Sequence, residues 1–387
     1  MTHTDLLRQL VAINSIFPNE LPLVEYMETL LQDWDFETVR QETPDPSRPN
    51  LLARKGSGKN TILIYGNSDT VPVYGNWKHD PFDLHIEGDL ATGLGVGDMK
   101  GGLTSVLLAM RDFTPEHYTL VFAFCVDEEN ISLGSNTLIG HPWLTNLVGA
   151  YVPETGLNAV KRENLPFNYM IGRPGRMDIE IIVPGRSAHG STGEGINALT
   201  EAAQIMLALK DQARTEHPVL GTAEWFFSSC SSSSTSLSIP DHAIITINRH
   251  MVPPETVESV IQELQMKIHE LYDSGVLCSD LSDKLVVQPR YRETPFSEPY
   301  LSDTTSQFVK ETDAVIHKSY GNVEYYCGTG VADENVLATR LNIPVLAIGP
   351  MGGDFHSDKE WVSLEGIQKT RDLYQEIFEH WDEVLRG

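Results

Sequence analysis

Five segments of the sequence carry acidic, amide or imidazole side chains just after an apolar run or inside a glycine-rich turn. In chain order they supply Asn67 and Asp69, Asp98, the run Asp127-Glu128-Glu129, Glu154, and His356. Oxygen and imidazole donors of this kind suit a divalent ion such as zinc or manganese. A carboxylate beside the ion that does not bind it is what a metal-assisted hydrolase needs as general base. Glu128, next to Glu129, fits that role.

Each segment also has a structural interpretation when it is taken alone. Asn67 and Asp69 could form an Asx turn that ends a strand, and Asp98 could cap the helix that follows it. The glycines around Asp98 indicate a close approach of the backbone to something, which a cap does not need. The acidic run 127–129 could be a solvated loop, and a lone histidine such as His356 is usually a surface residue. The metal-site interpretation therefore depends on these segments meeting in space.

The neighbouring elements explain why they would meet. Apolar runs at 51–53, 61–65 and 120–124 are typical of strands buried on both faces of a parallel sheet. Residues 101–113 and 302–312 are predicted to be helices. Open α/β sheets bind ligands at the carboxyl ends of their strands, where these polar segments stand. The predicted fold class is α/β, with a mixed, largely parallel sheet covered by helices on both faces.

A second pattern interrupts the first in the middle of the chain. Its order of strand, helix, two strands, helix and strand is that of a ferredoxin-like α+β layer. We therefore assign residues 1–172 and 293–387 to a catalytic metal-binding domain and residues 173–292 to an inserted lid or dimerisation domain. The serine-rich run 228–236 falls inside the insertion and is expected to be a polar loop or an edge strand.

Composition limits the possible partners and location. The 54 acidic and 28 basic side chains leave a formal charge of −26 over 387 residues, which argues against nucleic acid and anionic membrane partners. No segment approaches the roughly 18 consecutive apolar residues of a membrane span, and the first residues lack the features of a signal peptide. The four cysteines show no paired spacing. We expect a cytoplasmic protein.

Six ordered motifs resemble those of the co-catalytic metallopeptidase superfamily of acetylornithine deacetylase, succinyl-diaminopimelate desuccinylase, aminoacylase-1 and carboxypeptidase G. The resemblance covers nearly the whole chain. The motifs are G-x-x-D-T-V-P at 66–72, G-x-x-D-M-K-G-G at 95–102, D-E-E at 127–129, a glutamate at 154, G-x-x-A-H at 185–189 and H-S-x-x-E at 356–360.

The resemblance implies a metal centre with two ions bridged by Asp98. Glu129 and His356 would hold one ion, and Glu154 would help to hold the other. Where the family has an imidazole in G-H-x-D, this chain has Asn67, and the proline of the family's E-P-T after Glu154 is also missing. An amide oxygen is a harder and weaker zinc ligand than imidazole. We therefore expect the second ion to bind weakly, to be a harder cation, or to be absent.

The resemblance also implies roles for four further residues. Glu128 would be the general base, and Asp69 a carboxylate that supports the ligands from behind. His189, from the inserted layer, would steady the oxyanion, often across a dimer interface in such enzymes. Arg249 could bind a substrate carboxylate, and a structural salt bridge is an equal alternative for it.

The predicted function is metal-dependent hydrolysis of the amide bond of an N-acyl amino acid. It would use one or two divalent ions, foremost zinc, with cobalt or manganese as alternatives. A dipeptidase or aminopeptidase of the same superfamily is the alternative among enzymes, because loop residues without a signature build the substrate pocket. From another class, the alternative is a non-catalytic binding or scaffold homologue with a degraded metal site, against which the retained Glu128 and Glu129 argue. A homodimer is expected by analogy.

Overall fold

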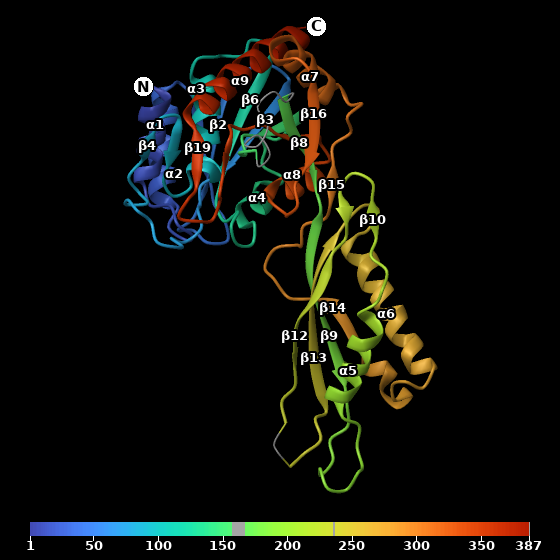
Figure 1. Cartoon of the computed structure of the whole chain (residues 1–387). Helices are drawn as coiled ribbons and strands as arrows, with labels where there is room; N and C mark the ends of the chain where they lie inside the picture. Colours follow the sequence, from blue (N-terminus) through green and yellow to red (C-terminus); the bar gives the residue numbers. More distant parts are fainter. Residues whose placement is uncertain (157–166, 235–236, 387) are drawn as a thin grey trace. The chain divides into compact units, whose positions relative to one another are not determined.

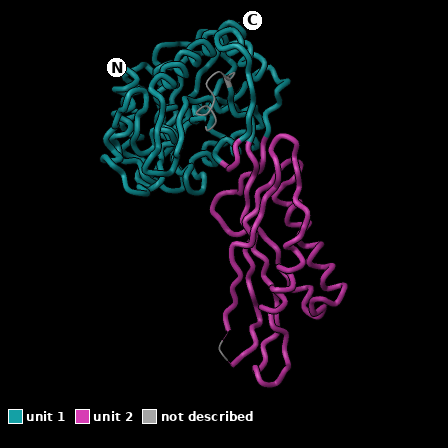
Figure 2. Tube along the Cα trace, in the orientation of Figure 1, with its two compact units in different colours: residues 1–172, 301–327, 332–387 teal, residues 173–300, 328–331 magenta. Residues whose placement is uncertain are grey.

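The computed structural model describes residues 1–156, 167–234 and 237–386, which divide into two units (Figures 1 and 2). Unit 1 comprises Met1–Gly172, Leu301–Cys327 and Ala332–Gly387, and unit 2 comprises Arg173–Tyr300 and Gly328–Val331. The second unit therefore ends eight residues beyond the boundary predicted at residue 292 and takes in a short segment from the later part of the chain.

A nine-stranded sheet forms the centre of unit 1, in the order β1-β2-β6-β3-β7-β17-β8-β15 with β16 paired to β8. The central strands β6, β3, β7 and β17 run parallel, whereas β1, β2 and β8 pair antiparallel with their neighbours β2, β6 and β17. The strands are β1 (Glu37–Gln41), β2 (Asn50–Gly56), β3 (Asn60–Asn67), β6 (Tyr118–Cys125), β7 (Leu147–Val152), β8 (Phe167–Arg173), β15 (Tyr300–Leu301), β16 (Val323–Cys327) and β17 (Val345–Ala347).

Helices cover this sheet. Every residue of β3 from 61 to 67 is buried, which requires cover on both faces. The mixed, largely parallel α/β fold is thereby confirmed, and none of the described helices has the length and apolar character of a membrane span. α1 (His3–Ala12), α3 (Gly101–Arg111), α7 (Gln307–Tyr320) and α9 (Leu364–Val384) pack together, while α2 (Leu21–Asp33) packs on β1 and β2, and α4 (Leu133–Leu138) on β6 and α8 (Asp333–Leu341).

One predicted helix of unit 1 is misplaced. The pattern at 302–312 predicts a helix there, but α7 begins only at Gln307 and continues to Tyr320. The Ser302 hydroxyl accepts a hydrogen bond from Val345 N–H at 2.9 Å and donates one to its carbonyl at 2.8 Å, so this part of the chain is held beside β17. The helix starts where the Ser306 side chain caps it.

Unit 2 has a four-stranded antiparallel sheet in the order β12-β13-β9-β14. Two helices pack on one face of it around a core of isoleucine, valine and leucine side chains. The serine-rich run begins in the edge strand β12, as expected, and its Thr235 and Ser236 lie outside the described residues. The elements follow the predicted order, with one added hairpin: β9 (Gly175–Pro184), α5 (Ala198–Leu209), β10 (Glu216–His217), β11 (Gly221–Thr222), β12 (Trp225–Ser231), β13 (His242–Met251), α6 (Val257–Asp273) and β14 (Val286–Pro289).

Candidate metal centre

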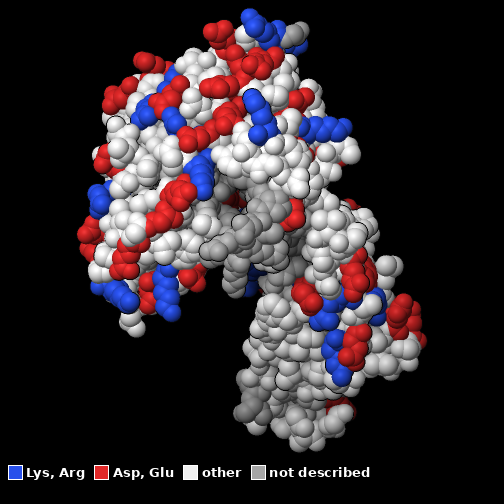
Figure 3. All heavy atoms as spheres, turned by 45° about the horizontal axis from the view of Figure 1, so that its top comes forward, with Lys and Arg blue, Asp and Glu red and all other residues white. Residues whose placement is uncertain are grey.

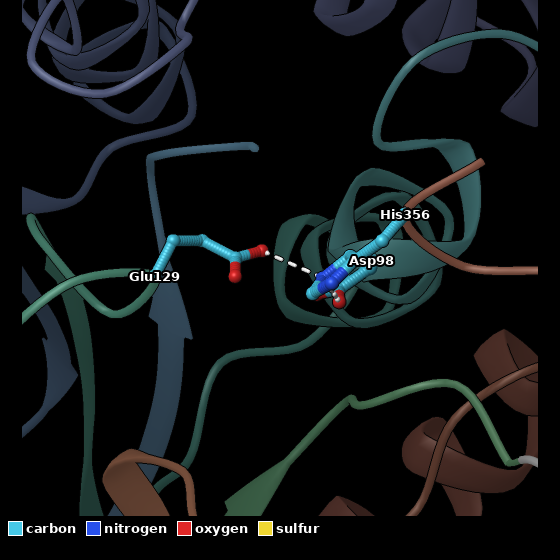
Figure 4. A group of neighbouring side chains, drawn as sticks. All are labelled: Asp98, Glu129 and His356. Carbon is cyan, nitrogen blue, oxygen red and sulfur yellow. Dashed lines mark hydrogen bonds and ion pairs between the residues drawn. The ribbon is translucent and has the colours of Figure 1, made fainter. Parts of the chain in front are cut away.

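Asp98, Glu129 and His356 come together in unit 1 although they are far apart in the sequence (Figure 4). His356 Nε2 lies 3.1 Å from Asp98 Oδ2 and 3.2 Å from Glu129 Oε1. One ligand atom from each residue lies within 4.8 Å of the other two. A zinc ion bonds nitrogen and oxygen ligands at about 2 Å, so small side-chain movements would place all three on one ion.

Strand pairing explains how these three segments meet. Glu129 follows the carboxyl end of β6, and Asp98 lies in the one-turn helix Val96–Lys100 that precedes α3. His356 lies in the loop between β18 (Gly352–Gly353) and β19 (Trp361–Ser363). Because β19 pairs with β5 (Leu90–Thr92), the loop that carries His356 is brought beside the turn that carries Asp98.

The loops of the site have an unusual backbone. Asp127, Asp354 and His356 all have positive φ values, of 75°, 54° and 58°. This left-handed region is unfavourable for residues with a Cβ atom, and such residues cluster at functional sites because the surrounding structure holds them there. In this chain the buried carboxylates of Asp69 and Asp127 help to hold the loop that carries Glu128 and Glu129.

Asp69 holds the backbone of the two neighbouring glutamates. It is 1% exposed, and its carboxylate accepts hydrogen bonds from Glu128 N–H at 3.1 Å and from Glu129 N–H at 2.9 Å. Burial raises the pKa of Asp69 well above its usual range, although these two N–H groups oppose the shift. Asp69 therefore lies behind the site and orients the residues that face it.

Asp127 anchors the same loop from its other side through contacts that sequence reasoning missed. Its carboxylate accepts hydrogen bonds from Arg48 at 2.7 Å and from the N–H groups of Ile131 and Leu133 at 3.2 and 3.1 Å. Arg48 also forms a buried ion pair with Glu20. Arg48 is 79 positions from Asp127 in the chain, so no local pattern signals this contact.

The site carries more negative charge than its one imidazole can balance. Asp98 and Glu129 stabilise the imidazolium form and raise the pKa of His356 to about 11. Burial raises the pKa of Glu128 well above its usual range, and the neighbouring Glu129 adds to the shift. Among the described residues, the buried Glu129 Oε1 faces the His356 imidazole at 3.2 Å and accepts no other hydrogen bond. This donor set therefore fits a divalent cation, which would replace the proton on His356.

Asn67 and Glu154 belong to the ends of β3, which pairs with β6, and of β7, which pairs with β3. Asn67 ends β3, is 4% exposed, and donates from Nδ2 to the carbonyl of Asp69 at 3.1 Å. Glu154 follows β7 and is half-buried. Because β6, β3 and β7 are adjacent and parallel, these two residues lie at the same edge of the sheet as Glu129. Glu154 is not part of the group of three.

His189 and Arg249 belong to unit 2. His189 is exposed, and its Nδ1 accepts a hydrogen bond from Ser191 N–H at 3.3 Å and lies 2.8 Å from the Ser191 hydroxyl. Arg249 is 3% exposed and forms an ion pair with Glu255. This ion pair is what the alternative role of Arg249, a structural salt bridge, predicts. Binding of a substrate carboxylate by Arg249 stays a prediction.

A second group of this composition lies at the opposite end of β6. Glu116, His117 and Asp382 also offer ligand atoms within 4.8 Å of one another. The Asp382 carboxylate accepts hydrogen bonds at 2.8 Å from the N–H groups of both Glu116 and His117, and it lies 3.0 Å from His117 Nδ1.

Comparison with known proteins agrees with this fold. The model of peptidase family M20/M25/M40 matches residues 63–380. The acetylornithine deacetylase of Pectobacterium carotovorum subsp. carotovorum (strain PC1) is 30% identical over 401 residues, which cover 97% of each chain. Two solved structures share the fold. The aminopeptidase PepT of Bacillus cereus ATCC 10987 has a TM-score of 0.75 at 17% identity and covers 98% of this chain and 97% of its own.

The YXEP protein of Bacillus subtilis, described as a dinuclear metal binding peptidase, has a TM-score of 0.71 at 15% identity and covers 99% of this chain and 98% of its own. Matches of this kind, below 25% identity, bear on the fold alone. The family model and the deacetylase cover most of the chain and carry the assignment. The chain thus belongs to peptidase family M20/M25/M40 and is a metal-dependent hydrolase that acts as a deacylase or a peptidase.

Proposed function

We propose that the chain hydrolyses the amide bond of an N-acyl amino acid. The observation that carries this proposal is the group formed by Asp98, Glu129 and His356, with a second carboxylate, Glu128, directly beside it. The similarity to acetylornithine deacetylase along almost the whole length favours a deacylase among the hydrolases of the family. Membership of a family of hydrolytic enzymes speaks against the scaffold alternative.

A divalent ion bound there would polarise the scissile carbonyl and lower the pKa of a water molecule. Glu128 accepts a proton from the attacking water and later delivers it to the amine nitrogen as the C–N bond breaks. The products are then a carboxylic acid and a free amine. Asp69 serves this step indirectly, because its hydrogen bonds to Glu128 and Glu129 hold both side chains in place.

His189 is the proposed donor to the carbonyl oxygen as negative charge develops on it. The N–H of Ser191, 3.3 Å from His189 Nδ1, points at this atom and so favours the ring form that presents an N–H group at Nε2. An Nε2–H group is a suitable oxyanion donor, and removal of one such donor typically costs about 100- to 1,000-fold in kcat. We also retain Arg249 as a proposed contact for a substrate carboxylate.

Zinc is the proposed metal, with cobalt and manganese as alternatives. Asp98 would bridge to a second ion held by Asn67 and Glu154. The Asn67 amide donates from Nδ2, so its oxygen is the atom left for a cation. An amide oxygen suits a harder cation than zinc, which supports a weak or empty second position. Elemental analysis after mild chelation tests this, and two tightly held zinc ions per chain would contradict it.

A homodimer through unit 2 is also proposed. β12 is an edge strand, residues 225–240 contain no charged side chain, and Leu207 and Phe226 are 56% and 57% exposed. In the view of Figure 3 the charged side chains of unit 2 gather to one side and leave its tip largely uncharged. A dimer by light scattering that Phe226→Asp dissociates would support this interface. The four cysteines are all free, which supports a cytoplasmic location.

A substrate panel tests the function. N-acetyl amino acids, N-succinyl amino acids and dipeptides are each offered to the purified protein with zinc, cobalt or manganese. We expect the N-acyl amino acids to be hydrolysed fastest and chelation to abolish the reaction. Faster hydrolysis of dipeptides would favour the dipeptidase or aminopeptidase alternative instead, and no hydrolysis with any metal would contradict the proposal.

A further inference from the structure

The Glu360 carboxylate accepts hydrogen bonds from the backbone of the turn that carries Asp98. Its Oε2 accepts a hydrogen bond from Gly95 N–H, and its Oε1 accepts hydrogen bonds from Gly97 and Asp98 N–H, all at 2.9 Å. The Glu360 side chain is nearly inaccessible, with 1% of the residue exposed. One buried carboxylate thus accepts hydrogen bonds from three N–H groups of the segment that presents a candidate ligand.

This turn depends on an outside acceptor for its shape. Gly95 has a φ of 73°, and Asp98 has non-helical angles inside the short helix. The N–H groups of such a turn have no regular partners in a helix or strand, and a buried N–H without a partner is destabilising. The two oxygens of Glu360 accept all three N–H groups, although the carboxylate is buried near that of Asp98. That unfavourable proximity indicates a benefit beyond packing.

The segment around Glu360 also holds Asp98 by its side chain. His356, four residues earlier, lies 3.1 Å from Asp98 Oδ2, so this one loop contacts both the backbone and the carboxylate of Asp98. The loop that carries His356 and Glu360 packs closely against the turn that carries Gly97 and Asp98. A Cβ atom on Gly97 would lie 2.5 Å from the Phe355 ring and 3.3 Å from Glu360 Oε1, which leaves no room for a side chain.

We propose that Glu360 is a positioning residue of the metal centre: by holding the turn at Gly95, Gly97 and Asp98, it fixes the Asp98 carboxylate where it can share a cation with Glu129 and His356. Glu360 acts through this turn, because both of its oxygens accept N–H groups of the turn. The inference rests on the proposed function, because it requires that a cation binds there.

The test compares zinc affinity in three variants by competition with a chromogenic chelator. Glu360→Gln keeps the size of the side chain but turns an amide NH₂ toward at least one backbone N–H. Gly97→Ala disturbs the same contact from the other side. Loss of a residue that orients a metal ligand typically costs 10- to 100-fold in affinity, and we expect about that loss in both. Asp382→Asn, which alters a carboxylate with two backbone donors at the other end of β6, should stay within about twofold of wild type.

Saturating cobalt provides a readout that general destabilisation would not change. We expect the visible absorption band of Glu360→Gln to differ from that of wild type, because Asp98 is displaced, and that of Asp382→Asn to match it. Circular dichroism of the metal-free proteins checks folding, and Gly97→Ala decides the question if Glu360→Gln does not fold. Wild-type affinity and spectrum in the folded variants would overturn this inference alone. A wild-type protein that binds no metal would overturn the metal centre itself.

Discussion

The two ends of β6 carry groups of the same composition, one histidine and two carboxylates, with very different surroundings. At the carboxyl end, Asp98, Glu129 and His356 come from three separate segments, and their ligand atoms face one another. At the amino end, Glu116 and His117 are consecutive, and Asp382 uses its oxygens to accept their backbone N–H groups. Proximity of ligand types alone therefore does not distinguish a metal site.

The difference lies in which carboxylates hold the backbone. At the carboxyl end that task falls to residues outside the group, namely Asp69 for Glu128 and Glu129, and Glu360 for the turn of Asp98. The ligand oxygens are then left to face His356 and a cation, as Glu129 Oε1 illustrates: it accepts no backbone N–H and lies 3.2 Å from His356 Nε2. At the amino end Asp382 performs the holding task itself, so it is better understood as a structural acceptor.

The largest expected effect is on activity and comes from Glu128, which lies beside the carboxyl-end group and has no counterpart at the amino end of β6. Glu128→Gln removes the proposed general base. It should lower kcat/KM on the best substrate of the panel by about 100- to 10,000-fold. Zinc content should not change, because Glu128 is not a proposed ligand. Glu116→Gln, which changes the exposed member of the amino-end group, should retain wild-type activity. Full activity of Glu128→Gln would contradict the proposed role.

A paired removal of the two histidines measures which group binds metal. His356→Ala deletes a proposed direct ligand, so zinc affinity should fall by more than the roughly 100-fold that marks the loss of an orienting residue. His117→Ala should leave it unchanged. Zinc per chain after dialysis against a weak chelator reports both. Equal losses in the two variants would mean that the amino-end group also binds zinc.

The effect of zinc on the thermal unfolding temperature should also distinguish the carboxyl-end group of β6 from the amino-end group. Zinc at 100 times its Kd stabilises the folded chain by about 2.7 kcal/mol, which for a domain of this size corresponds to a rise of about 5 to 10 °C in Tm. We expect this rise in wild type and His117→Ala and its loss in His356→Ala. Calorimetry with and without zinc would show it, and a rise that survives in His356→Ala would place the stabilising ion elsewhere.

The smallest expected effect concerns the structural role of Asp382. Partial burial raises its pKa, but the backbone N–H and ring of His117 and the N–H of Glu116 outweigh burial and lower it below 3.8. A lowered carboxyl pKa contributes stability that is present above the unfolded value and is lost as the pH falls through the folded value. Asp382→Asn should therefore cost about 1 kcal/mol at pH 7 and less near pH 3. Urea unfolding of the metal-free proteins at both pH values tests this, and a difference independent of pH would argue against an ionised Asp382.

The sequence predicted the parallel core of the fold because its signals are local. The apolar runs at 61–65 and 120–124 became β3 and β6, and the polar residues that follow them lie at one edge of the sheet. The motifs around Asp98 and His356 indicated residues that the structure brings together with Glu129. The predicted start of α7 was wrong because hydrogen bonds between Ser302 and Val345 compete with helix formation there. The spacing of apolar residues does not indicate such long-range hydrogen bonds.

The residues that hold the site could not be found in this way. Arg48 reaches Asp127 across 79 positions, and Glu360 reaches Asp98 across 262. A carboxylate that accepts backbone N–H groups has the same one-letter code as a solvated one, so only the tertiary structure separates them. Glu360 stood inside a motif, H-S-x-x-E, yet nothing in the motif shows that its partners are main-chain atoms.

The position of β17 has a consequence for the order in which the protein matures during synthesis. β17, residues 345–347, pairs with β7 on one side and with β8 on the other, so the sheet has a gap until this late segment leaves the ribosome. His356 emerges later still. A nascent chain that ends before Val345 should therefore retain zinc no better than His356→Ala, and cation capture would be one of the last events in maturation.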